Sequence, residues 1–351
     1  MIINGKRLAK PIFQGGMGVG ISLGGLAGAV AKAGGAGTIS AAQIGFREED
    51  FESNPMEANL RAMDKEMKKA REISPDGIIG FNIMVAMRGY EDYVRQAVRI
   101  GADFIVSGAG LPMELVKLVK SEQADSSLAL IPVVSTERAA KVILKGWSKK
   151  YDYIPDMLLV EGPKAGGHLG FSNQQLEEYK EDIYGEEVKK IILLCKEYEK
   201  EYQKKISVIL AGGISKAEDV KKAFLLGAEA VQSASRFVTT YECDASERFK
   251  EAYLNAKKED VILVKSPVGM MGRALSNHFT DEVMKGKQIK AKHCKGCLKS
   301  CHPNEAIYCI SEALIRSVSG DVENGLVFCG ANVHCSNHME SVESVIKSLL
   351  S

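Results

Sequence analysis

The sequence has 351 residues, of which 45% are hydrophobic and 26% charged, so it can bury an ordinary core in one large domain or two smaller ones. The formal net charge of +1 gives no preference for nucleic acid or for an acidic membrane surface as a partner. The first residues lack the apolar stretch of a signal peptide, and no apolar run elsewhere is long enough to span a membrane, so we expect a cytoplasmic protein.

Apolar runs alternate with helical patterns along most of the chain. We predict strands at 11–14, 37–41, 78–85, 104–107, 128–134, 157–160, 206–211 and 230–233. Helical patterns cover 23–33, 57–73, 90–100, 112–119, 136–145, 186–204 and 217–226. Several strand runs are apolar without alternation, which is typical of parallel strands covered on both faces. This order predicts an α/β fold with a parallel sheet.

Glycines and small polar residues end most of the predicted strands. In a parallel (β/α)₈ TIM barrel these ends form one active face, so we favour the barrel over a doubly wound sheet. The barrel pattern stops near residue 265. We therefore predict a barrel over residues 1–265 and a small C-terminal appendage over residues 266–351, packed on the barrel.

The first glycine-rich loop, 14–20, follows a predicted strand and precedes a helix of small residues. Gly18, Gly20 and Gly24 give G-x-G-x-x-x-G, which is not the dinucleotide-binding spacing, and no acidic residue ends the next strand. A loop that lets a flat ring approach the backbone explains these glycines better. A plain tight turn is the alternative.

Two further loops follow the seventh and eighth predicted strands. The first contains Gly212 and Gly213, and the second contains Ala234 and Ser235. A phosphate needs exposed backbone N–H groups, and paired loops at these two positions are the usual phosphate site of this barrel. The alternative is that the glycines only turn the chain.

His168 is the only histidine in the first 277 residues. It follows the sixth predicted strand in a loop of small residues, where its imidazole is exposed at the active face. An imidazole can move a proton near neutral pH, so we predict a catalytic role. A loop histidine hydrogen-bonded to the backbone is the alternative.

These segments together resemble the nitronate monooxygenase family, formerly called 2-nitropropane dioxygenases, and its relative, the FMN-dependent enoyl-ACP reductase II. The resemblance covers nearly all of residues 1–275, and Ala165-Gly166-Gly167-His168 is its most specific motif. The other matching segments are 14–17, 80–84, 161–170, 211–214 and 227–237.

The resemblance implies an FMN-binding barrel and a role for each matching residue. The implied cofactor site consists of Gly15, Gly16 and Met17 beside the flavin ring, Asn82 at its polar edge, Gly167 near the ribityl chain, and Gly212, Gly213, Ala234 and Ser235 at the phosphate. His168 is the implied catalytic residue. The chain departs from the family at Ala234-Ser235, where glycine-threonine is common, although serine keeps the hydroxyl. It also lacks the lysine that some members carry after the fifth strand.

The resemblance implies an oxidoreductase that oxidises alkyl nitronates with FMN and O₂. An NAD(P)H-dependent enoyl-thioester reductase is the alternative, since the fifth strand, 131–135, looks more like those enzymes. A flavin-binding redox sensor without turnover is a third possibility of another class. We expect a small-molecule substrate and no nucleic-acid or membrane partner, and a homo-oligomer is compatible with the sequence.

Six of the eight cysteines lie after residue 290. Cys294, Cys297, Cys301 and Cys309 could supply four thiolates to zinc or to an iron–sulfur cluster. Their spacing matches neither the usual ferredoxin run nor a paired zinc knuckle, so we favour reduced free thiols without metal.

Overall fold

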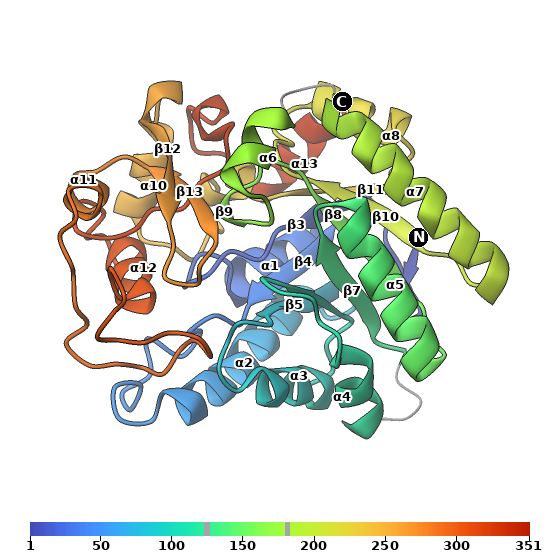
Figure 1. The fold of residues 1–351 in the computed structure, drawn as a ribbon, viewed down its shortest axis with the longest axis horizontal. Coiled ribbons are helices and arrows are strands. Elements are labelled where there is room, and N and C mark those ends of the chain that lie inside the picture. Colours follow the sequence, from blue (N-terminus) through green and yellow to red (C-terminus); the bar gives the residue numbers. More distant parts are fainter. Residues whose placement is uncertain (123–126, 180–182) are drawn as a thin grey trace.

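The computed structural model describes residues 1–122, 127–179 and 183–351. Within these residues, eight parallel strands close into a barrel in which the last strand pairs with the first (Figure 1). The barrel strands are β3 (Ile12–Gln14), β4 (Ala36–Ser40), β5 (Ile78–Met84), β6 (Phe104–Gly108), β7 (Ala129–Val134), β8 (Met157–Glu161), β10 (Ser207–Ala211) and β11 (Ala230–Ser233). The predicted TIM barrel is confirmed, and each predicted strand overlaps one of these eight.

Helices between the strands form the outer ring of the barrel. They are α1 (Gly24–Lys32), α2 (Pro55–Ile73), α3 (Tyr90–Arg99), α4 (Leu115–Glu122), α5 (Glu137–Tyr151), α7 (Ile183–Tyr202) and α8 (Ala217–Leu225). The last helix, α13 (Val342–Leu349), contacts both α8 and α1 and completes the ring between them. It buries an apolar stripe at helical spacing, Val342, Val345, Ile346 and Leu349.

The barrel strands bury apolar residues on both faces, which explains why their sequences do not alternate. Phe13, Phe104 and Leu159 point into one cluster inside the barrel, whereas other strand residues pack against the helices in a larger cluster. A hairpin of β1 (Ile2–Ile3) and β2 (Lys6–Arg7) adds Ile3 and Leu8 to the inner cluster. The sequence gives no clear signal for this hairpin, because its strands are only two residues each.

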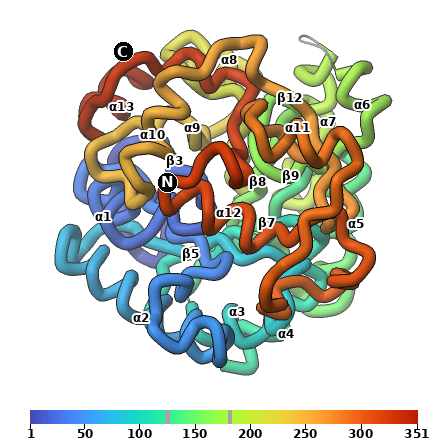
Figure 2. Tube along the Cα trace, turned by 90° about the vertical axis from the view of Figure 1, so that its left-hand side faces the viewer, coloured from blue at the N-terminus to red at the C-terminus, as the bar shows by residue number. Residues whose placement is uncertain are grey.

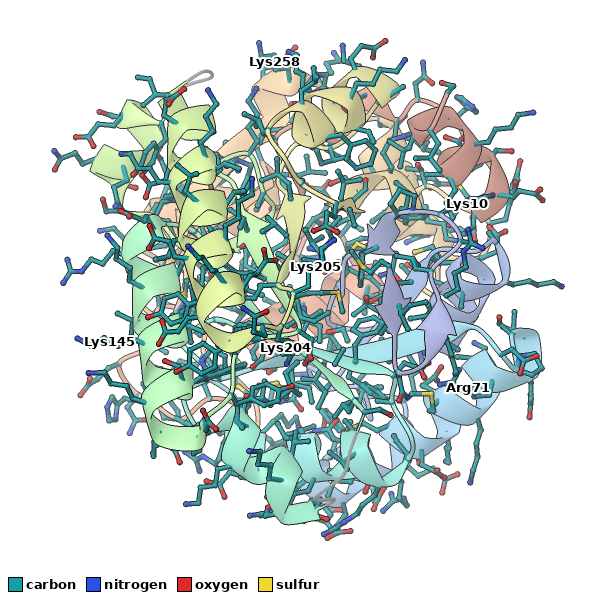
Figure 3. The ribbon with its side chains drawn as sticks, turned by 90° about the vertical axis from the view of Figure 1, so that its right-hand side faces the viewer. Lys10, Arg71, Lys145, Lys204, Lys205 and Lys258 are labelled. Atoms are coloured by element: carbon teal, nitrogen blue, oxygen red, sulfur yellow. The ribbon has the colours of Figure 1, made fainter. Side chains whose placement is uncertain are left out.

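Ion pairs hold the amino-terminal ends of the strands. The buried Asp103 carboxylate accepts the Ile79 N–H at 2.9 Å and pairs with Arg71 at 2.7 Å and with Lys6 at 2.9 Å. Burial alone would raise the pKa of Asp103, but these hydrogen bonds hold it below its usual value. Figure 3 shows Arg71 on this side of the molecule, with Lys204, which pairs with Asp156 at 2.8 Å. In TIM barrels this amino-terminal end generally serves stability rather than chemistry.

Residues 247–340, which we call the cover, lie over the carboxyl ends of the strands as the orange and red trace in Figure 2. The cover contains α10 (Glu247–Leu254), β12 (Val261–Lys265), β13 (Met271–Leu275), α11 (His278–Met284) and α12 (Ile310–Val318). In the loop after β8, the short strand β9 (Gly167–Leu169) pairs with β13, so that β12, β13 and β9 form an antiparallel three-stranded sheet. This sheet ties the loop after β8 to the cover.

Short helices complete the described structure: α6 (Asn173–Glu178), α9 (Ser235–Val238) and two 3₁₀ turns, Lys258–Asp260 and Val333–Cys335. None of the helices in the described residues combines the length and apolar character needed to cross a membrane. The division at residue 265 stays a prediction. The cover begins before that point, and α13, beyond it, belongs to the helix ring.

Candidate active site

A cavity of about 370 Å³ opens at the carboxyl ends of the barrel strands, which is the end where TIM barrels form their active sites. Loops after the strands form its inner wall, and the cover forms its outer wall through residues that include Tyr253, Leu314 and Phe328. Its volume lies within the range of small-molecule sites. All of the residues predicted to bind the cofactor or to act in catalysis line this cavity: Gly15, Gly16, Met17, Asn82, Gly167, His168, Gly212, Gly213, Ala234 and Ser235.

The loop after β3 brings bare backbone to the cavity. A Cβ atom on Gly16 would collide with the Cβ of Asn82, and the Asn82 amide donates a hydrogen bond to the Gly16 carbonyl at 3.1 Å. The buried Gln14 side chain holds the start of the loop by accepting the Thr38 N–H at 3.0 Å. The loop is therefore a rigid wall without side chains at Gly15 and Gly16, open to a flat ring.

The loops after β10 and β11 form a second backbone surface. Gly212 and Gly213 have φ values of 95° and 85°, in the left-handed region that favours glycine. The Asn332 amide, from the cover, donates to the Gly213 carbonyl at 2.8 Å. The Ser235 hydroxyl accepts the Gly330 N–H at 3.1 Å. We call this surface, with Lys164 beside Gly213, the cradle.

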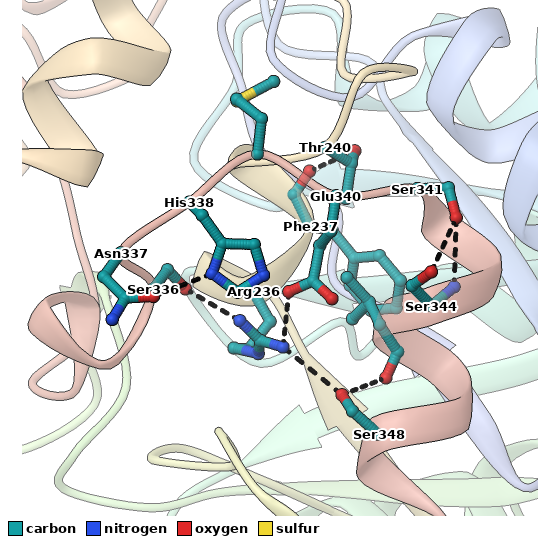
Figure 4. A network of polar contacts seen from close by, with 12 residues as sticks. Arg236, Phe237, Thr240, Ser336, Asn337, His338, Glu340, Ser341, Ser344 and Ser348 are labelled. Carbon is teal, nitrogen blue, oxygen red and sulfur yellow. Dashed lines mark hydrogen bonds and ion pairs between the residues drawn. The ribbon is translucent and has the colours of Figure 1, made fainter.

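Arg236 follows the cradle in sequence, but its guanidinium is engaged with the C-terminal part of the chain. It pairs with Glu340 at 2.6 Å and hydrogen-bonds the hydroxyls of Ser336 and Ser348, both at 3.3 Å (Figure 4). The two charged side chains are only 10% and 11% exposed. Arg236 therefore anchors α13 to the barrel, and Lys164 is the cationic side chain that lines the cavity at the cradle.

His168 lies on β9, between the barrel and the cover. Its Nε2 is 2.7 Å from the Ser266 hydroxyl oxygen, and its ring meets the Phe328 ring edge-on at 5.1 Å between centroids. Burial lowers the pKa of His168 to about 4, because an apolar environment disfavours the charged imidazolium. The imidazole is therefore neutral near pH 7 and can either accept a proton or donate a hydrogen bond.

Ser266 is fixed from two sides. Its hydroxyl oxygen accepts the Val268 N–H at 3.4 Å and contacts His168. The side chain is buried, so the hydroxyl has few alternative partners. Which atom donates between Ser266 and His168 depends on the imidazole tautomer. The serine nevertheless fixes the ring orientation, and through it the nitrogen left for a bound molecule.

Glu161 ends β8 opposite Ala211, and it also lines the cavity. Burial raises the pKa of its carboxyl to about 7, so a large fraction is protonated at neutral pH. A neutral carboxylic acid can donate a hydrogen bond as well as accept one. Glu161 thus offers a second titrating group besides His168 in the same cavity.

Four of these residues have no role predicted from the sequence. Glu161 and Lys164 lie within the motif around His168, at the end of β8 and just after it. This position could have indicated that both residues line the active face. Ser266 and Asn332 lie in the cover, far along the chain from the loops that they touch. No local pattern connects them to the cavity.

Comparisons with known proteins agree with this architecture. A family model described as nitronate monooxygenase matches residues 3–351. A probable nitronate monooxygenase of Staphylococcus aureus strain Newman is 28% identical over 158 residues, which are 43% of this chain and 42% of that protein. The match thus spans less than half the length of this curated relative.

Two solved structures share the fold over almost the whole chain. FabK from Thermotoga maritima superposes with a TM-score of 0.73 at 24% identity, covering 98% of this chain and 92% of that chain. A nitroalkane oxidase from Streptomyces ansochromogenes superposes with a TM-score of 0.70 at 17% identity, covering 97% and 95%. At these identities the likeness shows the fold alone.

Proposed function

The chain belongs to the nitronate monooxygenase family, and from this premise we propose that it is an FMN-dependent oxidoreductase that oxidises alkyl nitronates with O₂. The observation that carries this proposal is the content of one cavity. It combines a glycine-rich wall, the cradle and a neutral imidazole, which together support a flat ring, a phosphate and a proton-transferring group in one site.

The residues present fit a flavin mononucleotide. Gly15, Gly16 and Met17 leave room for the ring, Asn82 would meet its polar edge, and Gly167 would border the ribityl chain. The phosphate would lie in the cradle between Gly212, Gly213, Ala234 and Ser235, with Lys164 as a positive charge. When bound, FMN would supply the redox chemistry, taking electrons from the nitronate and passing them to O₂.

His168 would act on the substrate. Its neutral imidazole can hydrogen-bond the nitro group of a nitronate anion, and it can accept the carbon proton of a neutral nitroalkane. The low pKa keeps the base form available at any pH well above about 4. Ser266 would be a positioning residue, since it touches His168 rather than the substrate.

An NAD(P)H-dependent enoyl-thioester reductase is the second candidate. The observation in its favour is the apolar side of the cavity, which Val133, Val134, Met270, Leu314 and Phe328 form together. The β7 end supplies valines where some nitronate monooxygenases carry a lysine. Such a wall suits an acyl chain as well as it suits a nitroalkane.

The deciding experiment compares the two substrates on one preparation. The purified protein should be yellow, and heat should release FMN rather than FAD, because we propose a single phosphate site, in the cradle. O₂ uptake with a nitronate and without nicotinamide is the expected result. NAD(P)H consumption with crotonyl thioester and no nitronate turnover would establish the reductase instead. Bound flavin with neither turnover would indicate a redox-sensing protein.

A further inference from the structure

Glu161 is the one acidic side chain among the described residues that line the cavity. It shares the inward face of β8 with Leu159, two residues before it, so its carboxyl lies at the floor of the cavity. Its neighbour on β10 is Ala211, which is paired in turn with Gln232 on β11. Adjacent strands lie about 4.8 Å apart, so only a methyl group occupies the space of about 10 Å between the Glu161 and Gln232 backbones.

The Glu161 carboxyl has no partner that would stabilise its negative charge. Among the described residues, none donates a hydrogen bond to this carboxyl and no cation pairs with it, and burial alone accounts for its raised pKa. The other enclosed carboxylates are held firmly. Asp103 accepts a backbone N–H and pairs with Arg71 at 2.7 Å, and Asp244 accepts two backbone N–H groups and pairs with Lys69 at 3.0 Å. Those two carboxylates hold the fold together, whereas Glu161 is free to change its protonation.

The groups that face Glu161 from the barrel side do not compete with it for a proton near neutral pH. Tyr184, on α7, donates its hydroxyl to the backbone carbonyls of Ser135 and Glu161 at 3.0 and 3.1 Å, and burial raises its pKa well above 10. Burial lowers the pKa of His168 to about 4. The Lys164 side chain packs beside the cradle instead of pairing with Glu161.

The remaining neighbours are also fixed in charge or directed elsewhere. Glu187, also on α7, accepts the backbone N–H of Glu137 at 2.7 Å. From the cover, Arg273 binds the Ala165 carbonyl, and burial raises the pKa of the Cys329 thiol to about 12. Burial likewise raises the pKa of Tyr253 well above 10. Glu161 is therefore the group in this cavity that can gain or lose a proton near pH 7.

Negative charge that enters the cavity would favour the protonated form of Glu161. Like charges repel strongly in an enclosed site of low dielectric, and a nearby negative charge makes a carboxyl hold its proton more tightly. Since no donor compensates the carboxylate, protonation is the means of relief that its surroundings provide. Electrons delivered to a cofactor in this cavity are such a charge.

We propose that Glu161 is the proton acceptor that accompanies electron transfer in this cavity, taking up one proton for every two electrons that enter. The electrons come from the substrate, and the proton comes from solvent and forms an O–H bond on one carboxylate oxygen. The proton leaves again when the two electrons pass to O₂. The negative charge added to the cavity is thus smaller by one than that of the electrons alone. This inference rests on the flavin of the proposed function, but not on the identity of the substrate.

The first test measures the midpoint potential of the flavin-loaded protein against pH, with dithionite as the source of electrons. Below about pH 7 Glu161 is protonated in both redox states and adds nothing to the slope. Above that pH the potential should fall by an additional 30 mV or so per pH unit, because one proton per two electrons corresponds to about 30 mV for each tenfold change in proton concentration.

Glu161→Gln should lose this additional slope while keeping the slope below about pH 7, since the amide cannot titrate. Glu186→Gln, which removes an exposed carboxyl on α7, is the matched control and should behave as wild type does. The same slope in wild type and in Glu161→Gln would overturn the inference.

The second test needs no variant that binds flavin weakly. The infrared spectrum of the reduced wild-type protein minus that of the oxidised protein, at about pH 8, should show the C=O stretch of a newly protonated carboxylic acid. Glu161→Asp keeps a carboxyl and should shift this band, which assigns it. Absence of the band in wild type would overturn the inference. Because dithionite supplies the electrons, flavin-loaded protein that fails to oxidise nitronates would refute the proposed activity and leave both tests decisive.

Protein that binds no flavin would refute the cofactor, and this inference with it.

Discussion

The two walls of the cavity are built in different ways. The barrel wall is rich in glycine, and residues such as Gly16, Gly167 and Gly213 expose backbone to the cavity. The cover wall presents mainly side chains, among them the Phe328 ring and the Asn332 amide. The barrel wall is made of short loops after strands that pair with their neighbours. The cover reaches the same cavity from elements far along the chain.

Because the two walls differ in this way, we expect them to have different functions. The barrel wall would determine whether a flavin binds, since backbone close to a ring or a phosphate leaves no room for adjustment. The cover would determine how well the bound molecules are oriented, since its side chains touch His168 and the cradle from outside. His168 stands on β9, where the two walls meet. Substitutions in the barrel wall should therefore mainly affect whether flavin binds, whereas substitutions in the cover should mainly affect how the bound molecules are oriented.

The largest effect is expected at the junction of the walls. His168→Ala should keep flavin and fold but slow substrate-driven flavin reduction by about 10²–10⁴-fold, the usual contribution of a general base or hydrogen-bond donor. The loss should be greater for a neutral nitroalkane than for its nitronate anion, because only the former needs a base. Anaerobic stopped-flow reduction measures both, with the exposed His338→Ala as a control. Equal rates in wild type and variant would leave His168 without a catalytic role.

A charge in the barrel wall should remove the flavin. Gly213→Asp places a carboxylate in the cradle, where two like charges about 4 Å apart repel by about 4 kcal/mol at an intermediate dielectric, or about 10³-fold in affinity. The introduced carboxylate would also compete with the phosphate for Lys164, whose Cβ would lie 2.9 Å from the new Cβ.

Gly213→Ala separates charge from strain, since any side chain is strained at φ of 85°. Fluorescence titration with FMN should show a smaller loss for alanine than for aspartate, with circular dichroism reporting an intact barrel. If the aspartate variant binds flavin as tightly as wild type, the phosphate does not lie in the cradle.

The barrel wall should also make stability depend on pH. Because burial raises the pKa of Glu161 to about 7 from 4.5, the folded chain keeps a proton that the unfolded chain has lost. The Glu161 contribution to stability should fall as pH rises between these values and level off above them, by at most about 3 kcal/mol, whereas His168, whose pKa burial lowers from 6.5 to about 4, contributes the opposite slope below pH 6.5. In the cover, burial raises the pKa of the Cys329 thiol to about 12. This thiol therefore stays protonated over the pH range in which Glu161 titrates, and it adds no pH dependence to stability there.

Urea unfolding of the flavin-free protein at about pH 5 and about pH 8 measures this difference. Glu161→Gln keeps the shape of the side chain without the titration, and the part of the slope that it removes belongs to Glu161. Identical slopes in wild type and variant would show that the carboxyl is already ionised in the folded protein.

The smallest effect is expected for a cover residue at the cradle. Asn332→Ala removes the hydrogen bond to the Gly213 carbonyl, worth about 1 kcal/mol, so flavin should bind about fivefold to tenfold more weakly. Asn337→Ala, an exposed asparagine in the same part of the cover, should bind flavin as wild type does. A loss as large as that of Gly213→Asp would mean that the cover, and not the barrel, determines binding.

The barrel could be predicted from the sequence, but only part of the cavity could. Strands such as β7 and β8 are recognisable from their continuous apolar runs, and the loop after β8 from its glycines. β9 gave no such signal, because three residues gain their strand geometry only by pairing with β13. The functional roles of the predicted cofactor-binding and catalytic residues stay predictions, although all of these residues line one cavity.

The sequence by itself determined the barrel, its family and the backbone wall, because each depends on short-range patterns: apolar runs, helical spacing and glycines at fixed places after strands. Tertiary structure alone decided the protonation of His168 and Glu161, since burial sets those pKa values. It also decided that Ser266 holds His168 and that Arg236 holds α13 rather than a phosphate. These outcomes depend on contacts between residues about 100 positions apart, and no local pattern encodes them.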